Sequence, residues 1–310
     1  MEVTLGVDIG GTNSVFGVCD RSGNVLWSDT LKTSDYPSPE ALVRAISDAF
    51  RRVEGKYTLL AVGIGAPNGN YHSGTVEYAP NLHWKGSVPL AALFSASLKV
   101  PAFLTNDANA AAIGEMNFGS AKNIKNFVTI TLGTGLGSGI VIDGKVIHGH
   151  QGFAGEYGHI NVIPDGRMCS CGRRGCLEAY ASSTGVVRSI EELHSDHKAQ
   201  SSLRSLSSPT AKDVFVHAGK GDLFAQEIID FTTEILGAAL ADFACFSDPK
   251  AYILFGGIAQ NGPEIATSVK EAMERNILNI YKDKIEIRIS SLHDKNAAIL
   301  GTSSLAWNER

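Results

Sequence analysis

The stretch Val3–Leu26, VTLGVDIGGTNSVFGVCDRSGNVL, predicts a strand, a glycine-rich turn, a second strand, a tight turn and a third strand. The stretch Phe127–His148, FVTITLGTGLGSGIVIDGKVIH, predicts the same succession. The chain therefore holds two copies of one β-meander. Strand and helix patterns alternate along the rest of the sequence, which indicates an α/β fold.

The elements around the meanders follow from hydrophobic periodicity. Strands are expected at Leu59–Ile64, Val100–Leu104, Ala251–Phe255 and Ile285–Ile289, and helices at Pro39–Val53, Ala108–Met116, Phe224–Phe243 and Glu264–Asn276. The polar, serine-rich segment from Ser195 to Ser208 predicts a solvated loop or helix rim to which no chemistry is assigned.

Composition excludes several classes of protein. With 310 residues and 44% hydrophobic content, the chain can bury its own core and divide into two lobes. It begins without the segments of a signal peptide, and its longest uncharged stretch is shorter than the roughly 20 apolar residues of a membrane span. A net charge of −5 without a basic block argues against nucleic acid as a partner. With only five cysteines, these features predict a cytoplasmic protein that binds a small molecule and no membrane.

The glycine-rich turns of the two meanders are candidate phosphate-binding segments. Each offers backbone N–H groups and a threonine hydroxyl, and both kinds of donor suit phosphate oxygens. The first phosphate turn contains Gly10, Gly11 and Thr12, and the second phosphate turn contains Gly133, Thr134 and Gly135. Either turn alone could be a plain hairpin, and neither matches the P-loop or the dinucleotide-binding fingerprint. The pair together predicts a site for one nucleoside triphosphate.

Two aspartates follow the ends of predicted strands. Asp8 precedes the first phosphate turn and could hold Mg²⁺ through water, or it could only tighten the turn. Asp107 stands where TNDANAAA passes from a strand into an alanine-rich helix, so it could be the N-cap of that helix. Open α/β sheets bind ligands at the carboxyl ends of their strands, so Asn106 and Asp107 could also meet a substrate hydroxyl. Asp107 is therefore the candidate general base of a phosphoryl transfer.

The segment MCSCGRRGCLE, Met168–Glu178, contains three of the five cysteines. Cys169, Cys171 and Cys176 supply three thiolates, whereas a closed structural zinc site needs four ligands. His159, in the upstream sequence GEYGH, completes a Cys₃His set. A disulfide is the alternative, but a reducing compartment argues against it and one thiol would be left over.

A zinc ion at this place would also fix two carboxylates. Glu156 and His159 are three residues apart and share a face if the segment is helical, and Glu178 closely follows the last cysteine. Carboxylates accept paired hydrogen bonds from adjacent hydroxyls. Together with an aspartate and the amides of Asn81 and Asn106, the two glutamates therefore predict a site for a polyol such as a sugar. The alternative is that they are ordinary surface carboxylates.

Six motifs together resemble the ROK family of repressors and sugar kinases, over essentially the whole chain. They are VDIGGTN at Val7–Asn13, TNDANAAA at Thr105–Ala112, TLGTGLGSG at Thr131–Gly139, GEYGH at Gly155–His159, CSCGRRGCLEAY at Cys169–Tyr180 and FGGIAQNG at Phe255–Gly262. Within the family, the chain is most similar to bacterial ATP-dependent glucokinases, through GAP at Gly65–Pro67, GTV at Gly74–Val76, APNLHW at Ala79–Trp84 and VPL at Val88–Leu90.

The resemblance implies an actin-like ATPase-domain fold of the ribonuclease H-like type, in which each of two lobes has a mixed sheet flanked by helices. The small N-terminal lobe would comprise residues 1–118 and a C-terminal helix of about residues 295–310. The large lobe would comprise residues 119–294 and contain the zinc motif. A homodimer is also implied.

The resemblance also assigns roles to residues. The sugar would be contacted by Gly65, Asn81, Asn106, Asp107, Glu156, His159 and Glu178, with Asp107 as the base. The phosphates would meet Gly10, Gly11, Thr12, Thr134 and Gly135, and the adenosine would lie against Gly256 and Gly257. Zinc would bind His159, Cys169, Cys171 and Cys176. Three residues depart from the family pattern: Asn13 replaces a common lysine, Asn68 lengthens the usual GAPG turn, and His83 replaces a small residue on the sugar side.

The activity implied by the resemblance is transfer of the γ-phosphoryl group of MgATP to the 6-hydroxyl of glucose. A ROK kinase for N-acetylglucosamine, mannose or fructose stays an alternative, because no pocket residue decides among the hexoses. A non-catalytic sugar sensor is a further alternative. The repressors of the family carry a DNA-reading helix-turn-helix before the first phosphate turn, and only seven residues precede Asp8, so no such unit is expected.

Overall fold

The computed structural model describes residues 1–261, 263–292 and 294–310. His293 and Gly262, the last residue of the FGGIAQNG motif, lie outside the described residues. The chain forms two compact units: unit 1 contains Met1–Lys125, Gly139–Ala154 and Ser291–Arg310, and unit 2 contains Asn126–Ser138 and Gly155–Ser290. The two lobes expected from the resemblance stay a prediction. Contacts within the chain assign residues 139–154 to unit 1.

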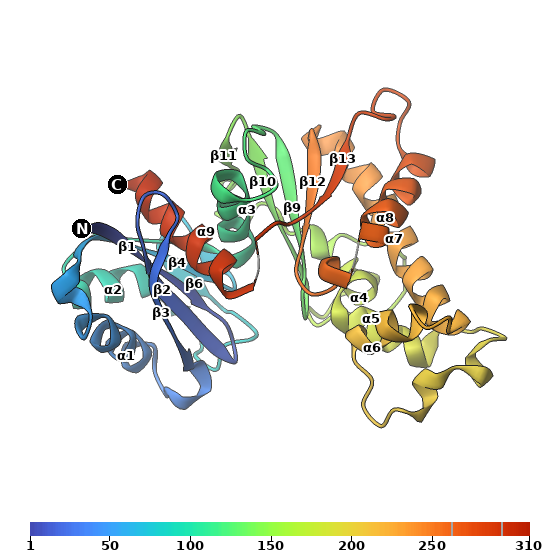
Figure 1. Ribbon diagram of the computed structural model, residues 1–310, viewed down its shortest axis with the longest axis horizontal. Coiled ribbons are helices and arrows are strands. Elements are labelled where there is room, and N and C mark those ends of the chain that lie inside the picture. The colour runs from blue at the N-terminus through green and yellow to red at the C-terminus, as the bar shows by residue number, and fades with distance from the viewer. Residues whose placement is uncertain (262, 293) are drawn as a thin grey trace. The chain divides into compact units, whose positions relative to one another are not determined.

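Unit 1 is built on a five-stranded sheet with the strand order β3-β2-β1-β4-β8. Strands β1, β2, β3 and β4 of this sheet are labelled in Figure 1. Its strands are β1 (Glu2–Ile9), β2 (Asn13–Cys19), β3 (Val25–Lys32), β4 (Thr58–Ala66) and β8 (Ala102–Asn106). The first three strands form the predicted antiparallel meander. Strand β4 is parallel to both β1 and β8. The carboxyl ends of β1, β4 and β8 therefore share one edge of the sheet, where α/β proteins commonly bind ligands.

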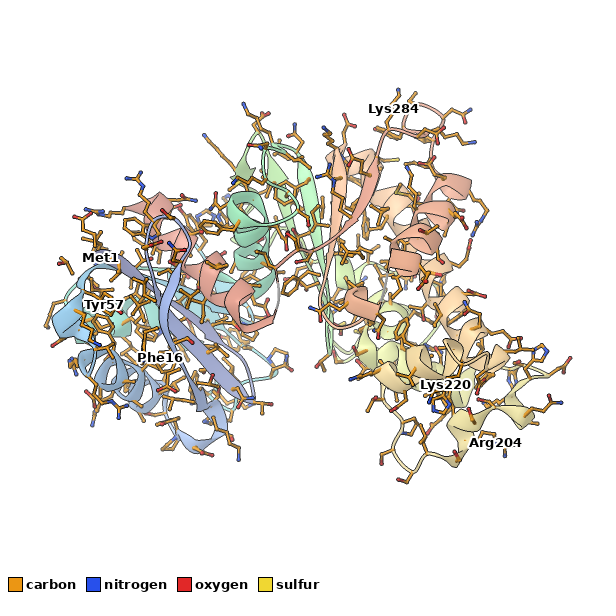
Figure 2. All side chains as sticks on the ribbon, in the orientation of Figure 1. Met1, Phe16, Tyr57, Arg204, Lys220 and Lys284 are labelled. Atoms are coloured by element: carbon orange, nitrogen blue, oxygen red, sulfur yellow. The ribbon has the colours of Figure 1, made fainter. Side chains whose placement is uncertain are left out.

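One face of this sheet is covered by helices α1 (Pro39–Arg51) and α2 (Leu90–Leu98), which together with the strands enclose the core of the unit. Leu5 of β1, Ile46 of α1 and Phe94 of α2 are fully buried there. Phe16 of β2 belongs to the same core and lies inside the unit (Figure 2). The apolar positions of α1 follow helical spacing, and its N-cap Ser38 accepts a hydrogen bond from the N–H of Ala41 at 3.2 Å.

The opposite face carries helix α9 (Asp294–Glu309), which packs on β1 and β4 and against helix α3 (Asp107–Phe118). Glycines in the strands allow this approach. A Cβ added to Gly63 would lie 1.7 Å from the carbonyl oxygen of Thr302, and one added to Gly6 would lie 2.4 Å from that of Ile299. No other residue fits at these positions unless the helix moves away, so glycine sets the distance between the sheet and α9.

The strands of unit 2 belong to a second five-stranded sheet with the order β11-β10-β9-β12-β13. They are β9 (Phe127–Leu132), β12 (Ala251–Phe255), β13 (Glu286–Ile289) and the start of β10 (Leu136–Ile142), whose end lies in unit 1 with β11 (Lys145–Val146). Strand β12 is parallel to both β9 and β13. In both sheets the three strands of the meander come first, in reverse chain order, and the next two strands along the sheet follow in chain order. The predicted duplication is therefore confirmed.

The helices of unit 2 follow the cysteine-rich segment in the chain. They are α4 (Glu178–Ala181), α5 (Ser183–Glu192), α6 (Ala211–Ala218), α7 (Leu223–Ser247) and α8 (Pro263–Asn276). The serine-rich segment contains only two short 3₁₀ turns, Lys198–Gln200 and Ser202–Ser205, and Arg204 lies at the outer surface of the unit (Figure 2). This segment is the polar loop that the sequence predicts.

Periodicity missed helices α2, α4, α5, α6 and α9, of which α9 was expected only from the family resemblance. It also missed a small sheet of β5 (Gly69–Asn70), β6 (Thr75–Glu77) and β7 (Ser87–Val88). The strands of this sheet are two or three residues long, too short to show an alternating pattern. Helix α2 is apolar on nearly all sides and shows little helical periodicity. In the described part of the chain, no helix combines the length and apolarity that crossing a membrane requires.

Thr232 offers a test of packing in helix α7. Its side chain is 2% exposed, and its hydroxyl has no hydrogen-bond partner among the described residues. A buried, unpaired hydroxyl costs roughly 1–3 kcal/mol, and valine has nearly the same shape. We expect Thr232→Val to raise the free energy of unfolding by about 1 kcal/mol in urea titrations. Thr233→Val is the matched control, because the hydroxyl of Thr233 donates to the carbonyl oxygen of Ile229 at 3.0 Å. An equal gain in both variants would contradict the argument.

Candidate active site

Predicted site residues of unit 1 meet at the carboxyl ends of three parallel strands. Asp8 of β1 pairs in register with Gly65 of β4, and Gly65 pairs with Thr105 of β8. A Cβ added to Gly65 would lie 3.3 Å from Oδ1 of Asp8, so glycine leaves space beside that carboxylate. Asn106 and Asp107 follow Thr105 directly. The sheet therefore brings Asp8, Gly65, Asn106 and Asp107 to one edge.

The first turn of helix α3 corrects one prediction. The N-cap is Asn106 and not Asp107, because Oδ1 of Asn106 accepts the N–H of Ala108 at 2.8 Å. Asp107 is the first helical residue, and its Oδ1 accepts the same N–H at 2.8 Å. No hydrogen bond from another residue to its Oδ2 is seen in the described part of the chain, and the residue is exposed on its outer side. The carboxylate is thus oriented by one oxygen and open to a ligand at the other.

The two carboxyl groups of this edge influence each other. Burial raises the pKa of Asp8 to about 7, and the charge of Asp107 adds to the rise. Burial also raises the pKa of Asp107, an effect that the N–H of Ala108 opposes. Two neighbouring carboxylates repel each other when both are ionised. Protonation of one of them, or a cation bound between them, removes this repulsion. The pair therefore favours a bound cation when both groups are charged.

The raised pKa of Asp8 predicts a pH dependence of stability. The carboxyl titrates near 3.8 in the unfolded chain and near 7 in the folded one, so the folded protein binds more protons between these values. The free energy of unfolding must then fall as the pH rises from about 4 to about 7, and level off above. Asp8→Asn, which mimics the neutral acid, should flatten this slope in calorimetric unfolding of the ligand-free protein. Asp196→Asn is the exposed control. If Asp8→Asn and Asp196→Asn show the same dependence of unfolding free energy on pH, the raised pKa is wrongly assigned to Asp8.

Asn81 lies against the first phosphate turn. A Cβ added to Gly11 would lie 2.3 Å from the backbone oxygen of Asn81, so only glycine permits this approach. The N–H of Gly10 donates to the carbonyl oxygen of Asn13 at 3.0 Å and closes the turn between β1 and β2. Thr12 and Asn81 are both exposed. A hydroxyl and an amide are therefore accessible to a ligand at this turn.

Asn68 and His83, which depart from the family pattern, both have partners within unit 1. Asn68 adopts the left-handed backbone conformation with a φ of 51°, which asparagine tolerates better than most residues. Its amide donates to the carbonyl oxygen of Glu77 at 2.9 Å. Nε2 of His83 lies 2.8 Å from the carbonyl oxygen of Tyr36. Each departure thus has a structural explanation of its own.

The second phosphate turn connects β9 to β10 in unit 2. The carbonyl oxygen of Gly133 accepts the N–H of Ser183 at 2.9 Å, and that of Thr134 accepts the hydroxyl of Thr184. The N–H groups of Thr134 and Gly135 have no acceptor in the described chain. Unpaired N–H groups in a turn are the donors that bind phosphate oxygens.

Gly256 and Gly257, the residues expected to face adenosine, lie beside this turn. Gly256 has a φ of 103°, and a Cβ there would lie 2.7 Å from the carbonyl oxygen of Leu132, so the position requires glycine. A Cβ on Gly257 would meet no atom within 4 Å. Because Leu132 is followed directly by Gly133, both groups of predicted nucleotide residues in unit 2 are neighbours.

The four predicted zinc ligands converge in unit 2. One possible ligand atom from each of His159, Cys169, Cys171 and Cys176 lies within 4.8 Å of the others. The sulfurs of Cys171 and Cys176 are 3.7 Å apart, and that of Cys169 is 3.6 Å from Nδ1 of His159. A tetrahedral zinc with Zn–S bonds of about 2.3 Å separates its sulfurs by about 3.8 Å. The donors and their spacing fit zinc, whereas the disulfide alternative fails because all five cysteines are free.

The short 3₁₀ helix Tyr157–His159 places Glu156 and His159 on one side, as expected. Oε2 of Glu156 lies 3.9 Å from Nε2 of His159, while Nδ1 of the same ring faces Cys169. The two ring nitrogens therefore have separate surroundings. One faces the cysteines, and the other faces a carboxylate, as is typical of metal-binding histidines.

Glu178 joins the cysteine loop (Met168–Leu177) to the second phosphate turn. Its Oε1 accepts the hydroxyl of Ser170 at 3.1 Å, and its Oε2 accepts the N–H of Leu136 at 3.0 Å. A Cβ added to Gly135 would lie 2.4 Å from Oε2, so glycine lets the carboxylate come this close to the turn. A carboxylate can accept about four hydrogen bonds, which leaves Glu178 capacity for the hydroxyls of a ligand.

Sequence reasoning missed three supporting residues: Ser170, Thr184 and Arg167. The guanidinium of Arg167 is buried and donates to Glu192 at 2.8 Å and to the carbonyl oxygens of Ala179 and Gly185 at 3.1 and 3.2 Å. It thereby ties the start of the cysteine loop to α4 and α5. The sequence holds no spacing that reveals these contacts. Ser170, between two of the cysteines, is the one whose position could have suggested a role.

Comparison with known proteins adds a direct indication of family. A model of the ROK family matches residues 4–309. The chain is 37% identical over 313 residues to a glucokinase of Streptomyces coelicolor, covering 99% of this chain and 98% of that protein. It is 35% identical over 307 residues to a glucokinase of Halalkalibacterium halodurans, covering 96% of this chain and 92% of that protein.

The structure is also similar to a solved one. The crystal structure of a ROK family glucokinase from Streptomyces griseus, in complex with glucose and AMPPNP, matches with a TM-score of 0.83 and 34% sequence identity. The match covers 99% of this chain and 99% of that chain. This similarity confirms the expected actin-like ATPase-domain fold.

Proposed function

The chain belongs to the ROK family, and on this premise we propose that it is an ATP-dependent glucokinase. The enzyme transfers the γ-phosphoryl group of ATP to the 6-hydroxyl of glucose. The observation that carries the proposal is the convergence of Asp8, Gly65, Asn106 and Asp107 at the carboxyl ends of β1, β4 and β8. Its relatives at 35–37% identity are glucokinases.

Asp107 is the proposed general base. The N–H of Ala108 holds Oδ1, so Oδ2 is free to accept the proton of the 6-hydroxyl. As that proton moves, the sugar oxygen bonds to the γ-phosphorus, and the bond from this phosphorus to the bridging oxygen of the departing ADP breaks. Although one side of Asp107 is accessible, the protein atoms packed around its carboxylate partly desolvate it and raise its pKa, which makes it a stronger base than a fully solvated carboxylate.

Asp8 is the residue that would hold Mg²⁺. Its raised pKa reflects first the burial of the carboxyl group and then the charge of Asp107, and a divalent cation offsets both costs of ionisation. Mg²⁺ commonly binds one or two carboxylates together with water and substrate phosphates. When bound, the ion neutralises charge on the transferred phosphoryl group.

The proposed sugar and nucleotide residues are those implied by the resemblance. Sugar contacts are assigned to Gly65, Asn81, Asn106 and Asp107 in unit 1 and to Glu156, His159 and Glu178 in unit 2. Phosphate contacts are assigned to Gly10, Gly11, Thr12, Gly133, Thr134 and Gly135, and adenosine contacts to Gly256 and Gly257. Exposed amides and carboxylates suit sugar hydroxyls, and the free N–H groups of the second phosphate turn suit phosphate.

Zinc has a structural role in this proposal. His159, Cys169, Cys171 and Cys176 would supply all four ligands of a closed site, which leaves no position open for substrate. The ion would fix the cysteine loop, and through Ser170 the loop orients the carboxylate of Glu178. The family resemblance further supports a homodimer, which sedimentation would test. The free cysteines and their proposed role as thiolate ligands suit a reducing cytoplasm.

Phosphorylation of sugars by the purified protein tests the proposed function. ADP release would be followed with MgATP and a panel of glucose, mannose, fructose and N-acetylglucosamine, and the product from glucose would be identified by NMR. We expect the highest kcat/KM with glucose and the phosphate on its 6-oxygen. A preference for another hexose would keep the mechanism and reject glucose as the substrate. The lack of turnover with every sugar would favour a sensor.

A further inference from the structure

We propose that Thr184 is a positioning residue for the second phosphate turn, and that the connector Glu178–Thr184 couples this turn to the carboxylate of Glu178. The inference rests on the proposed function and deepens it, because it names what holds the phosphate-binding donors in place. All the residues that carry it lie in unit 2.

The orientation of the turn follows from two hydrogen bonds. The hydroxyl of Thr184 donates to the carbonyl oxygen of Thr134, and the N–H of Ser183 donates to that of Gly133 at 2.9 Å. In a trans peptide the C=O of one residue and the N–H of the next point in opposite directions. Fixing the carbonyls of Gly133 and Thr134 therefore turns the N–H groups of Thr134 and Gly135 the other way. Neither of these two N–H groups has an acceptor in the described part of the chain.

Thr184 lies beside a buried serine that fixes the connector. Ser182 is 0% exposed, and its hydroxyl oxygen lies 3.0 Å from Oγ1 of Thr184, a packing contact, because the hydroxyl of Thr184 donates its proton to the turn. The same hydroxyl donates to the carbonyl oxygen of Glu178 at 2.7 Å and accepts the N–H of Gly185 at 3.1 Å. The hydroxyl of Ser182 thus stabilises the connector through hydrogen bonds to its own backbone and to the next residue, Gly185.

The connector also meets the far end of the turn. The N–H of Leu136, the residue that follows Gly135, donates to Oε2 of Glu178 at 3.0 Å. The first two residues of the turn are therefore held by the end of the connector, and the residue after the turn is held by its beginning. A sugar that orders the Glu178 carboxylate would also order the turn, which predicts that glucose and nucleotide increase each other's affinity.

Thr184→Val tests the positioning role, because it removes the hydroxyl and keeps the shape. The loss of one hydrogen bond predicts a roughly two- to tenfold higher dissociation constant for magnesium-AMPPNP. Glucose affinity without nucleotide should stay within about twofold, because Glu178 keeps both of its partners. The factor by which glucose tightens AMPPNP binding should fall toward one. Both affinities would be measured by titration calorimetry on the full chain.

Three further variants make the result specific. Thr184→Ser restores the hydroxyl and should restore AMPPNP affinity and the coupling with glucose. Thr184→Ala keeps the test valid if valine disturbs the start of α5, and thermal unfolding would confirm that each variant is folded. Thr232→Val, in helix α7, is the matched control and should leave both affinities unchanged.

The outcomes separate this inference from the proposed function. Wild-type AMPPNP affinity and coupling in both Thr184→Val and Thr184→Ala would overturn the inference, even where the protein phosphorylates glucose. A wild-type protein that binds AMPPNP but phosphorylates no hexose would overturn the proposed function, and the Thr184 variants would still decide the role of the connector. A wild-type protein that fails to bind AMPPNP would overturn both.

Discussion

Asp107→Asn should lower kcat with glucose and MgATP by roughly 10²–10⁴-fold, while the dissociation constant of glucose changes by no more than about threefold. Asparagine cannot accept the proton of the 6-hydroxyl. It does keep a carbonyl oxygen that can accept the N–H of Ala108, as Oδ1 of Asp107 does at 2.8 Å. The start of helix α3 should therefore be preserved. Steady-state kinetics would give kcat, and calorimetric titration would give the affinity for glucose.

The matched control is Asp196→Asn, which makes the same change at an exposed position in the serine-rich segment. It should keep wild-type turnover. Near-normal kcat in Asp107→Asn would show that another group accepts the proton. A large loss of glucose affinity with little change in kcat would instead make Asp107 a residue for binding.

Cys171→Ser should abolish zinc binding, lower the melting temperature and raise the KM for glucose roughly tenfold or more. A structural zinc site contributes on the order of 10 kcal/mol of folding free energy, so its loss should disorder the cysteine loop. Cys171 is exposed, whereas Cys176 is fully buried, so this change removes a ligand with little loss of packing. Glucose binding should suffer because Ser170 would no longer orient Glu178. Elemental analysis, thermal unfolding and kinetics measure the three effects.

Cys245→Ser is the control for this prediction, because Cys245 is also exposed and free but lies outside the ligand cluster. It should keep zinc content, melting temperature and KM. Wild-type protein purified without chelators should contain about one zinc per chain. A wild-type protein without zinc, with ordinary stability and activity, would refute the structural role of the ion.

The fold was predictable where local patterns repeat. The two meanders each carry strand alternation and a glycine-rich turn, and their duplication predicted that both sheets contain the same three-stranded meander. The order of the two further strands in each sheet was not predicted. The close packing of α9 was not predictable. Gly6 and Gly63 lie in the interior of strands, where glycine weakens a strand pattern. Only the position of a helix from the far end of the chain explains why they are glycine.

The candidate site was predictable to the extent that its residues lie in spaced motifs. The cysteine spacing and His159 predicted the ligand cluster, and the sequence placed Asp8 and Asp107 each at the end of a strand. That the two carboxylates lie at one edge follows from the sheet order. The N-cap at Asn106 was missed, because both residues are good caps and only the hydrogen bonds distinguish them. Thr184 was missed because its partner is 50 residues away in the sequence.

Helix α9 has a consequence for how the chain folds as it leaves the ribosome. Strands β1 and β4 are made long before the helix that covers their glycine-lined face. Unit 1 therefore cannot complete its packing until α9 has emerged, whereas all of unit 2 precedes α9 in the chain. The unit begun first should be finished last, and a released chain that is truncated before Asp294 should hold a protease-resistant unit 2 beside a protease-sensitive unit 1.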